Sequence, residues 1–134
     1  MSRLLQEEQA QGKVAIVYAE IKREFGSVPN FFKAQAAVDA DWLEVNWQRE
    51  KVIMLSSGGL DRKTRELIAY AVSEVNRNEY CILAHEGMAR DSGATDQEID
   101  QTRQIIELFC SFNAIAETLR VPIDIGPEIP VEIT

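Results

Sequence analysis

Cys81 and His85 are the residues whose types and spacing best suit chemistry. The chain has one histidine, and it follows a cysteine by four residues. On a helix such residues share a face, with about 5–6 Å between their Cβ atoms, so a thiol and an imidazole can meet or share a water. The thiolate is the nucleophile, and a nearby base or imidazolium lowers the pKa of a thiol. A small buried cysteine and a hydrogen-bonded histidine fit the same spacing, so this alternative stays open.

Glu66 is the second candidate. Tyr70 and Ser73 share its helical stripe at i+4 and i+7, beside the apolar positions, which predicts a half-buried carboxylate. Burial raises the pKa of a carboxylate toward the range that suits proton transfer. The alternative is a solvated Glu66 that pairs with Arg62 or Lys63, one turn earlier.

Two further residues are weaker candidates. Tyr80 either donates a phenolic hydrogen bond into the site or fills core space. Cys110 lies in an apolar stretch and is expected to be a buried, inert thiol. One histidine and one suitable cysteine leave a structural zinc short of its four ligands unless Asp or Glu completes the set. No metal and no other cofactor is therefore expected.

Three helices are expected before the candidate site. The first covers the apolar positions 14–25, and Asn30 is expected to cap a short second helix. Asp39 or Asp41 opens the third, which the Ser-Ser-Gly-Gly run at 56–59 ends.

Two more helices must position the candidate residues, and a long one follows them. Asp61 suits the N-cap of a helix over about 62–77. The next runs over about 79–90, with Gly93 as a left-handed C-cap. Residues 95–98 form a capping box that opens the last helix. The apolar stripe expected for the first of these helices comprises Leu67, Ile68, Ala71, Val72 and Val75.

Length and composition predict one all-α domain. The chain has 134 residues, of which 46% are hydrophobic and 27% charged, as in an ordinary globular domain. Strand-like alternation occurs only after Pro122, at Ile123 and Ile125 and at Ile129, Val131 and Ile133. Residues 1–121 are therefore expected to form the helical domain, and residues 122–134 an extended C-terminal tail.

Charge and hydropathy exclude several functions. The net charge of −8 makes nucleic acid an unexpected partner. No apolar run approaches the ~20 residues that span a bilayer, so membrane attachment is not expected. The first 11 residues are polar and acidic, unlike a secretory signal, and two cysteines are too few for a disulfide framework. A cytoplasmic location is expected.

Four segments together resemble the AhpD-like (alkylhydroperoxidase) and carboxymuconolactone decarboxylase superfamily, in its peroxidase-related branch. The similarity covers about residues 26–121, and the combined pattern is far more specific than the Cys–His pair. The segments are FGSVPN at 25–30, LDRKTRELI at 60–68, NEYCILAH at 78–85 and SGATDQEI at 92–99. The resemblance implies an AhpD-like helical bundle.

The resemblance also implies roles for individual residues. Glu66 matches the proton-relay glutamate, Cys81 the second cysteine of the redox pair and His85 the motif histidine. In the family, a thiolate attacks the peroxide and the other cysteine resolves the sulfenic acid as a disulfide. Here Asn78 occupies the first cysteine's position, so that disulfide cannot form, and Tyr80 stands where AhpD often has a second histidine. Tyr70 is counted with Asn78 and Tyr80 among the supporting residues.

Three functions follow, and whether the chain is an enzyme stays open among them. The favoured one is a one-cysteine thiol antioxidant, a peroxidase in which Cys81 reacts with a hydroperoxide, His85 and Glu66 move protons, and an external thiol is the reductant. The second is a carboxymuconolactone decarboxylase-like enzyme on a small lactone or carbonyl compound. The third is a non-enzymatic binding or sensing protein.

The resemblance further implies a homo-oligomer, as a dimer, trimer or hexamer. Trp42, Trp47 and the apolar tail agree with this, because they offer surface to bury.

Overall fold

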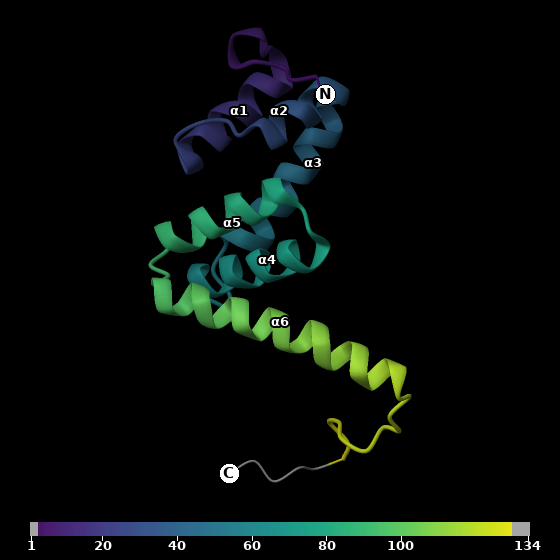
Figure 1. The fold of residues 1–134 in the computed structure, drawn as a ribbon. Helices are drawn as coiled ribbons and strands as arrows, with labels where there is room; N and C mark the ends of the chain where they lie inside the picture. Colours follow the sequence, from purple (N-terminus) through teal and green to yellow (C-terminus); the bar gives the residue numbers. More distant parts are fainter. Residues whose placement is uncertain (1–2, 130–134) are drawn as a thin grey trace. The chain divides into compact units, whose positions relative to one another are not determined.

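The computed structural model describes residues 3–129, which form two compact units, one up to Gly59 and one from Leu60 onward. We call them unit 1 and unit 2 and describe each by itself. Figure 1 shows the helices in chain order. They are η1 (Glu7–Gln9), α1 (Gly12–Phe25), α2 (Asn30–Val38), α3 (Ala40–Glu50), the π-helical turn η2 (Lys51–Leu55), α4 (Arg62–Asn76), α5 (Glu79–Asp91) and α6 (Asp96–Thr118).

Trp47 lies at the centre of unit 1. It is fully buried, and its ring meets those of Phe25 and Phe32 edge-on at centroid distances of 5.9 and 5.6 Å. Its indole N–H donates to Glu20 Oε2 at 2.7 Å. Trp42, by contrast, is 49% exposed, so the core accommodates one of the two tryptophans.

The helix starts in unit 1 test two sequence predictions. Asp39 rather than Asp41 caps α3, because its carboxylate accepts from the Trp42 N–H at 2.9 Å. The predicted Asn30 cap is wrong: α2 already includes Asn30, and the capping position is Pro29. The Pro29 carbonyl accepts the first backbone hydrogen bond, from the Phe32 N–H at 3.1 Å.

The helix ends predicted for unit 2 are confirmed. Asp61 Oδ1 accepts from the Thr64 N–H at 2.8 Å at the start of α4. Thr95 and Glu98 form a reciprocal capping box at the start of α6. Gly93 has φ +100°, a left-handed conformation that costs glycine little, and follows the end of α5.

The face that α4 buries differs from the predicted one. Its buried residues are Glu66, Tyr70 and Ser73, whereas Ile68 and Val72 are 48% and 53% exposed. The predicted apolar stripe is thus wrong at Ile68, Val72 and Val75, whereas Leu67 packs against the core cluster that contains Ile99. The reason is that the polar stripe of α4 carries the hydrogen bonds to α5 and α6 that are described below.

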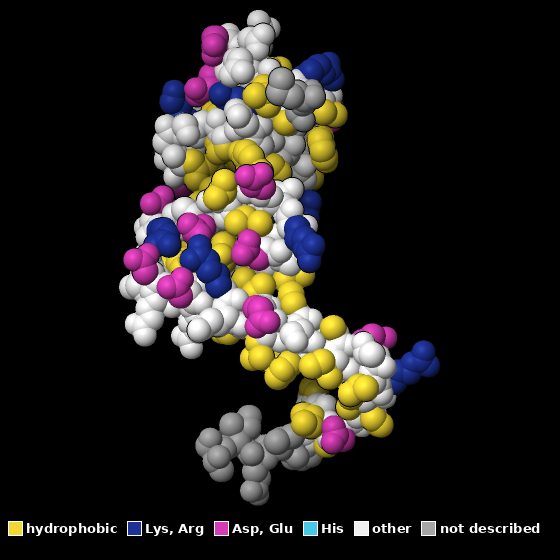
Figure 2. All heavy atoms as spheres, viewed as in Figure 1, with side chains coloured by type: hydrophobic (Ala, Val, Ile, Leu, Met, Phe, Trp, Pro, Cys, Tyr) yellow, Lys and Arg dark blue, Asp and Glu magenta, His cyan; other side chains and the backbone are white. Residues whose placement is uncertain are grey.

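The second half of α6 is uncovered. Every residue from 107 to 125 is exposed, and yellow apolar side chains lie along this helix in Figure 2. The prediction of a buried Cys110 is therefore wrong, because no described part of unit 2 covers this segment. Of the predicted tail, residues 122–129 are non-helical, with one isolated bridge between Gly126 and Ile129. Val131 and Ile133 lie outside the described residues, and the domain boundary at 121/122 stays a prediction.

Candidate functional site

A buried hydrogen bond joins α4 to α5 in unit 2. The Glu66 side chain has no exposed surface, and its Oε2 lies 2.7 Å from His85 Nδ1. Its Oε1 accepts from Arg62 Nε at 2.9 Å. An ionised carboxylate only accepts hydrogen bonds, so its bond to His85 requires the imidazole tautomer with the proton on Nδ1, which leaves Nε2 for another partner. The sequence offered burial of Glu66 and pairing of Glu66 with Arg62 as alternatives. In the structure both occur, and the Glu66 side chain is fully buried rather than half-buried.

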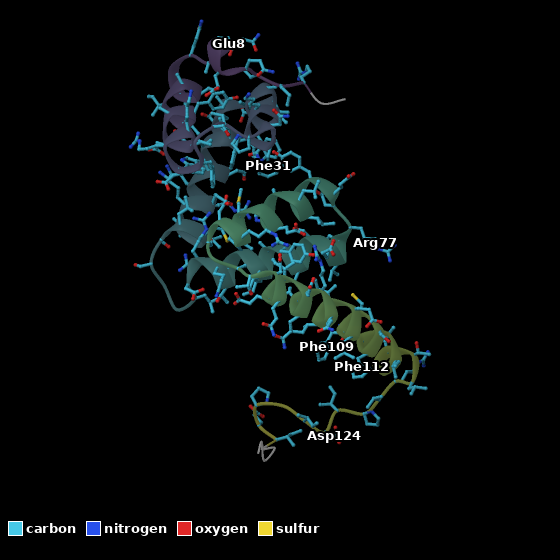
Figure 3. The ribbon with its side chains drawn as sticks, turned by 60° about the vertical axis from the view of Figure 1, so that its left-hand side comes forward. Glu8, Phe31, Arg77, Phe109, Phe112 and Asp124 are labelled. Carbon is cyan, nitrogen blue, oxygen red and sulfur yellow. The ribbon has the colours of Figure 1, made fainter. Side chains whose placement is uncertain are left out.

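The connection between α4 and α5 makes this meeting possible. Arg77 adopts a left-handed conformation with φ 57°, and Asn78 then caps α5. Two connecting residues make the helices neighbours in an αα-hairpin, with Arg77 at the bend in Figure 3. Arg62 and Glu66 are one turn apart on α4, so Arg62 reaches Glu66 along the helix while Glu66 reaches across to His85 on α5.

Cys81 begins the same helix face as His85. It lies in the first turn of α5, where its backbone N–H donates to Asn78 Oδ1 at 2.9 Å. The thiol residue is partly buried. The positive end of a helix dipole favours negative charge at such a position. His85 follows one turn later and is 20% exposed, so solvent reaches the neighbourhood of the Glu66 pair.

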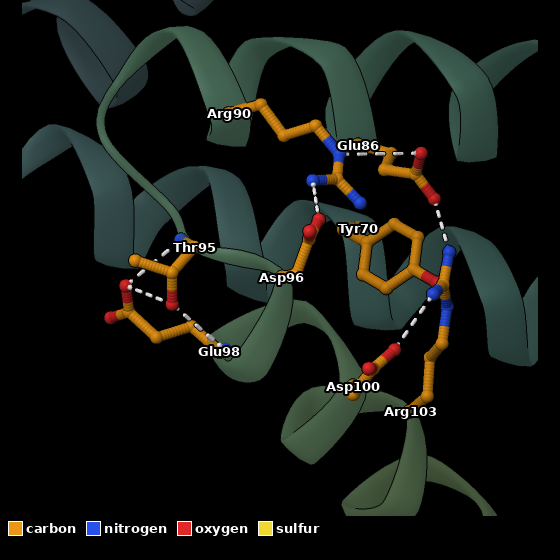
Figure 4. Close-up of polar contacts among 8 residues, drawn as sticks. All are labelled: Tyr70, Glu86, Arg90, Thr95, Asp96, Glu98, Asp100 and Arg103. Carbon is orange, nitrogen blue, oxygen red and sulfur yellow. Dashed lines mark hydrogen bonds and ion pairs between the residues drawn. The ribbon is translucent and has the colours of Figure 1, made fainter.

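Tyr70 belongs to a second polar network rather than to the Glu66 pair. Its hydroxyl accepts from Arg103 Nε at 3.0 Å and donates to Glu74 Oε2 at 3.4 Å. Burial raises the pKa of the Tyr70 phenol, and the Arg103 guanidinium opposes that rise. Arg103 also binds Glu86, and so ties α6 to α5 as well as to α4 (Figure 4). Arg103 lies 33 residues from Tyr70 and carries no local sequence signal, so it was not among the predicted residues.

The other two candidate residues are exposed. Tyr80 is 46% exposed, and Cys110 is exposed on α6. In residues 3–129 no group of three His, Cys, Asp or Glu side chains is placed to hold a metal. No helix in that range is long and apolar enough to cross a membrane. A pocket of about 260 Å³ in unit 1 holds none of the candidates and is lined by Phe31, Phe32, Asn46, Arg49, Glu50, Ile53 and Met54.

The arrangement of the helices is that of the AhpD-like helical proteins. The crystal structure of the alkylhydroperoxidase AhpD core from Rhodospirillum rubrum matches with a TM-score of 0.87 at 32% identity, covering 92% of this chain and 93% of that one. The predicted all-α, AhpD-like, single-domain fold is thereby confirmed. The sequence model of the carboxymuconolactone decarboxylase family matches residues 35–124. The chain belongs to this family.

Two curated relatives are similar over part of the chain. An alkyl hydroperoxide reductase of Mycobacterium tuberculosis is 37% identical over 87 residues, which are 65% of this chain and 25% of that protein. An uncharacterized protein of the cox locus of Paracoccus denitrificans is 34% identical over 67 residues, 50% of this chain and 56% of that protein. The chain thus spans about a quarter of the first relative and little more than half of the second.

Proposed function

We propose that this protein is a peroxidase-related thiol antioxidant with Cys81 as the reactive thiol and His85 and Glu66 as a proton relay. The hydrogen bond of 2.7 Å between a fully buried Glu66 and His85, one turn beyond Cys81, carries the proposal. The names of two similar proteins, an alkyl hydroperoxide reductase and an alkylhydroperoxidase core, support peroxide as the substrate.

The proposed step divides the chemistry among the three residues. His85 takes the thiol proton of Cys81 on Nε2, while Glu66 holds Nδ1–H and stabilises the imidazolium. The thiolate attacks one peroxide oxygen and the O–O bond breaks. The departing alkoxide takes a proton from the imidazolium and leaves as an alcohol, and Cys81 becomes a sulfenic acid.

Regeneration requires a thiol from outside the site. Asn78 has no sulfur and cannot resolve the sulfenic acid. An external thiol therefore attacks the Cys81 sulfur and releases water, and a second thiol reduces the mixed disulfide. We propose a small hydroperoxide as substrate, an external thiol reductant and a homo-oligomeric assembly.

Trapping the sulfenic acid tests the proposal directly. After mild peroxide treatment, dimedone should label the wild type and the Cys110→Ser variant at Cys81, and intact mass should show the adduct. The Cys81→Ser variant, with the same helical circular dichroism, should not be labelled at that site. An unlabelled Cys81 in correctly folded wild type would refute the peroxidase.

Asn78 favours a second candidate, a carboxymuconolactone decarboxylase-like enzyme on a small lactone or carbonyl compound. That reaction needs Glu66 and His85 as acid and base, and needs no thiol pair. A Cys81→Ser variant that keeps full lactone turnover would favour this enzyme over the peroxidase. A non-enzymatic binding or sensing role would instead leave peroxide and lactone unconverted by the wild type.

A further inference from the structure

Large apolar side chains form a continuous row along α6. Successive members are one, three or four residues apart, so they gather on one side of the helix in the spacing of a helix–helix seam. Each is between 39% and 70% exposed. We call this row the α6 stripe, and it comprises Ile105, Leu108, Phe109, Phe112, Ile115 and Leu119.

The α6 stripe faces away from the rest of unit 2. The side of α6 that meets α4 and α5 carries the fully buried Ile99 and the Tyr70-binding Arg103. At about 100° per residue, that side continues outward through Cys110, Ala114 and Glu117. The helices of unit 2 therefore do not cover the stripe.

The size of the stripe suits a protein interface. Large side chains contribute about 150–250 Å² each, so six of them about half exposed present on the order of 500 Å². A stable dimer buries roughly 800 Å² per partner, and the stripe would supply more than half of that. An isolated helix of the length that projects here is marginal in water, so a partner would also stabilise it.

The composition of the projecting segment points to a second copy as that partner. The chain carries a net charge of −8, so two copies repel over most of their surface. Residues 107–119 hold only two charged side chains, Glu107 and Glu117, and both lie off the stripe. The rings of Phe109 and Phe112, labelled in Figure 3, meet edge-on at 6.1 Å. An aromatic centre poor in charge is typical of interface cores, and the absence of Lys and Arg in this segment argues against an anionic membrane.

We propose that α6 docks on α6 of a second copy through this stripe. Two identical apolar rows related by a twofold axis are self-complementary, because each residue meets its counterpart or a neighbour of it. The inference rests on the homo-oligomer proposed above and assigns the surface that forms it.

Two glutamate substitutions on one helix test the assignment. Phe112→Glu places a carboxylate in the stripe, whereas Ala114→Glu places one on the other side of α6 as a matched control. Light scattering after size exclusion should show wild type and Ala114→Glu assembled and Phe112→Glu dissociated. Self-association should weaken roughly 30-fold or more, as for a central aromatic residue. Circular dichroism reports whether the helices are kept.

Each outcome has a separate meaning. A monomeric wild type would refute both the homo-oligomer and the stripe. An assembled Phe112→Glu variant, or dissociation of both variants, would refute the stripe alone. If Phe112→Glu fails to fold, maleimide labelling replaces it, with two proteins that both carry Cys81→Ser. The first keeps Cys110, which lies off the stripe. The second carries Phe109→Cys and Cys110→Ser, so its one thiol lies in the stripe, and the first should react several-fold faster. Equal rates would overturn the proposal.

Discussion

Replacement of Glu66 by Gln probes the buried pair, because it exchanges one carboxylate oxygen for a nitrogen and hardly changes the size of the side chain. The carboxylate is fully buried and accepts one charge-assisted hydrogen bond from Arg62 and one from His85. Such bonds are each worth about 1.5–3 kcal/mol net. Gln keeps one acceptor oxygen but turns an NH₂ group toward the other donor. Both bonds therefore lose their charged acceptor, and the contact with His85 survives only if the imidazole moves its proton to Nε2 and accepts on Nδ1.

We expect Glu66→Gln to lower the free energy of unfolding by about 2–4 kcal/mol, below the ~3–5 kcal/mol of deleting a buried partner, because at least one bond survives. Urea denaturation followed by far-ultraviolet circular dichroism measures it. Tryptophan fluorescence would report unit 1, since Trp42 and Trp47 both lie there. Protein concentration must be equal for all variants, because assembly shifts apparent stability.

A matched control separates the pair from the loss of charge as such. Glu107→Gln removes the same charge from an exposed position on α6 and should leave the unfolding curve unchanged. A Glu66→Gln curve that coincides with wild type would refute the buried pair. In a double-mutant cycle with His85→Gln, the two changes should couple by about 0.5–3 kcal/mol, and strict additivity would contradict a direct contact.

Three further predictions concern single side chains. Asn78→Ala should destabilise the protein by about 0.5–2 kcal/mol through loss of the α5 cap, and Asn78→Cys should permit a disulfide with Cys81, seen as protection from alkylation after oxidation. Burial raises the pKa of Tyr18 to about 12, so the stability that its neutral phenol contributes is complete below pH 10 and lost as pH rises through 12. When tyrosinate absorbance is followed during an alkaline titration, the most alkaline step should be missing in Tyr18→Phe. The hydrogen bond from Lys63 lowers the pKa of Glu98, so the stability that this ionised carboxylate contributes is present above pH 4.5 and lost as pH falls through the lower folded pKa. In Glu98→Gln, this loss of stability at acid pH should disappear from a series of denaturation curves measured at different pH. An unchanged loss would contradict the pairing with Lys63.

Local signals predicted the helix boundaries well. A helix end depends on groups within one turn of it, so the residues nearby in the sequence are enough to predict it. Here these groups are the side-chain acceptors of Asp61 and Thr95 and the left-handed backbone of Gly93. Asn30 failed for the same local reason: a proline one residue earlier already adopts the extended conformation of a cap. The family resemblance assigned Glu66 and His85 to one site, but 19 residues separate them and no local pattern predicted their hydrogen bond.

Contacts between helices that are distant in the sequence could not be predicted from local patterns. Periodicity shows that α4 has an apolar side, but it cannot say which side meets α5, and the polar stripe of Glu66 does so here. The same limit explains Cys110, whose apolar neighbours predicted burial although it lies on the other side of α6 from them. Arg103 carried no pattern at all, because its partners come from two other helices.

The position of Asn78 explains how the site proposed above can hold Cys81 and His85 without a second cysteine. It is the N-cap of α5, where asparagine is among the best residues and where its side chain satisfies the Cys81 N–H. The residue that the family resemblance aligns with the resolving cysteine therefore stabilises the first turn that holds Cys81. His85 is held independently, by Glu66 from α4. A reaction that needs one thiol and a relay, or the relay alone, keeps all its parts, and only the internal disulfide is given up.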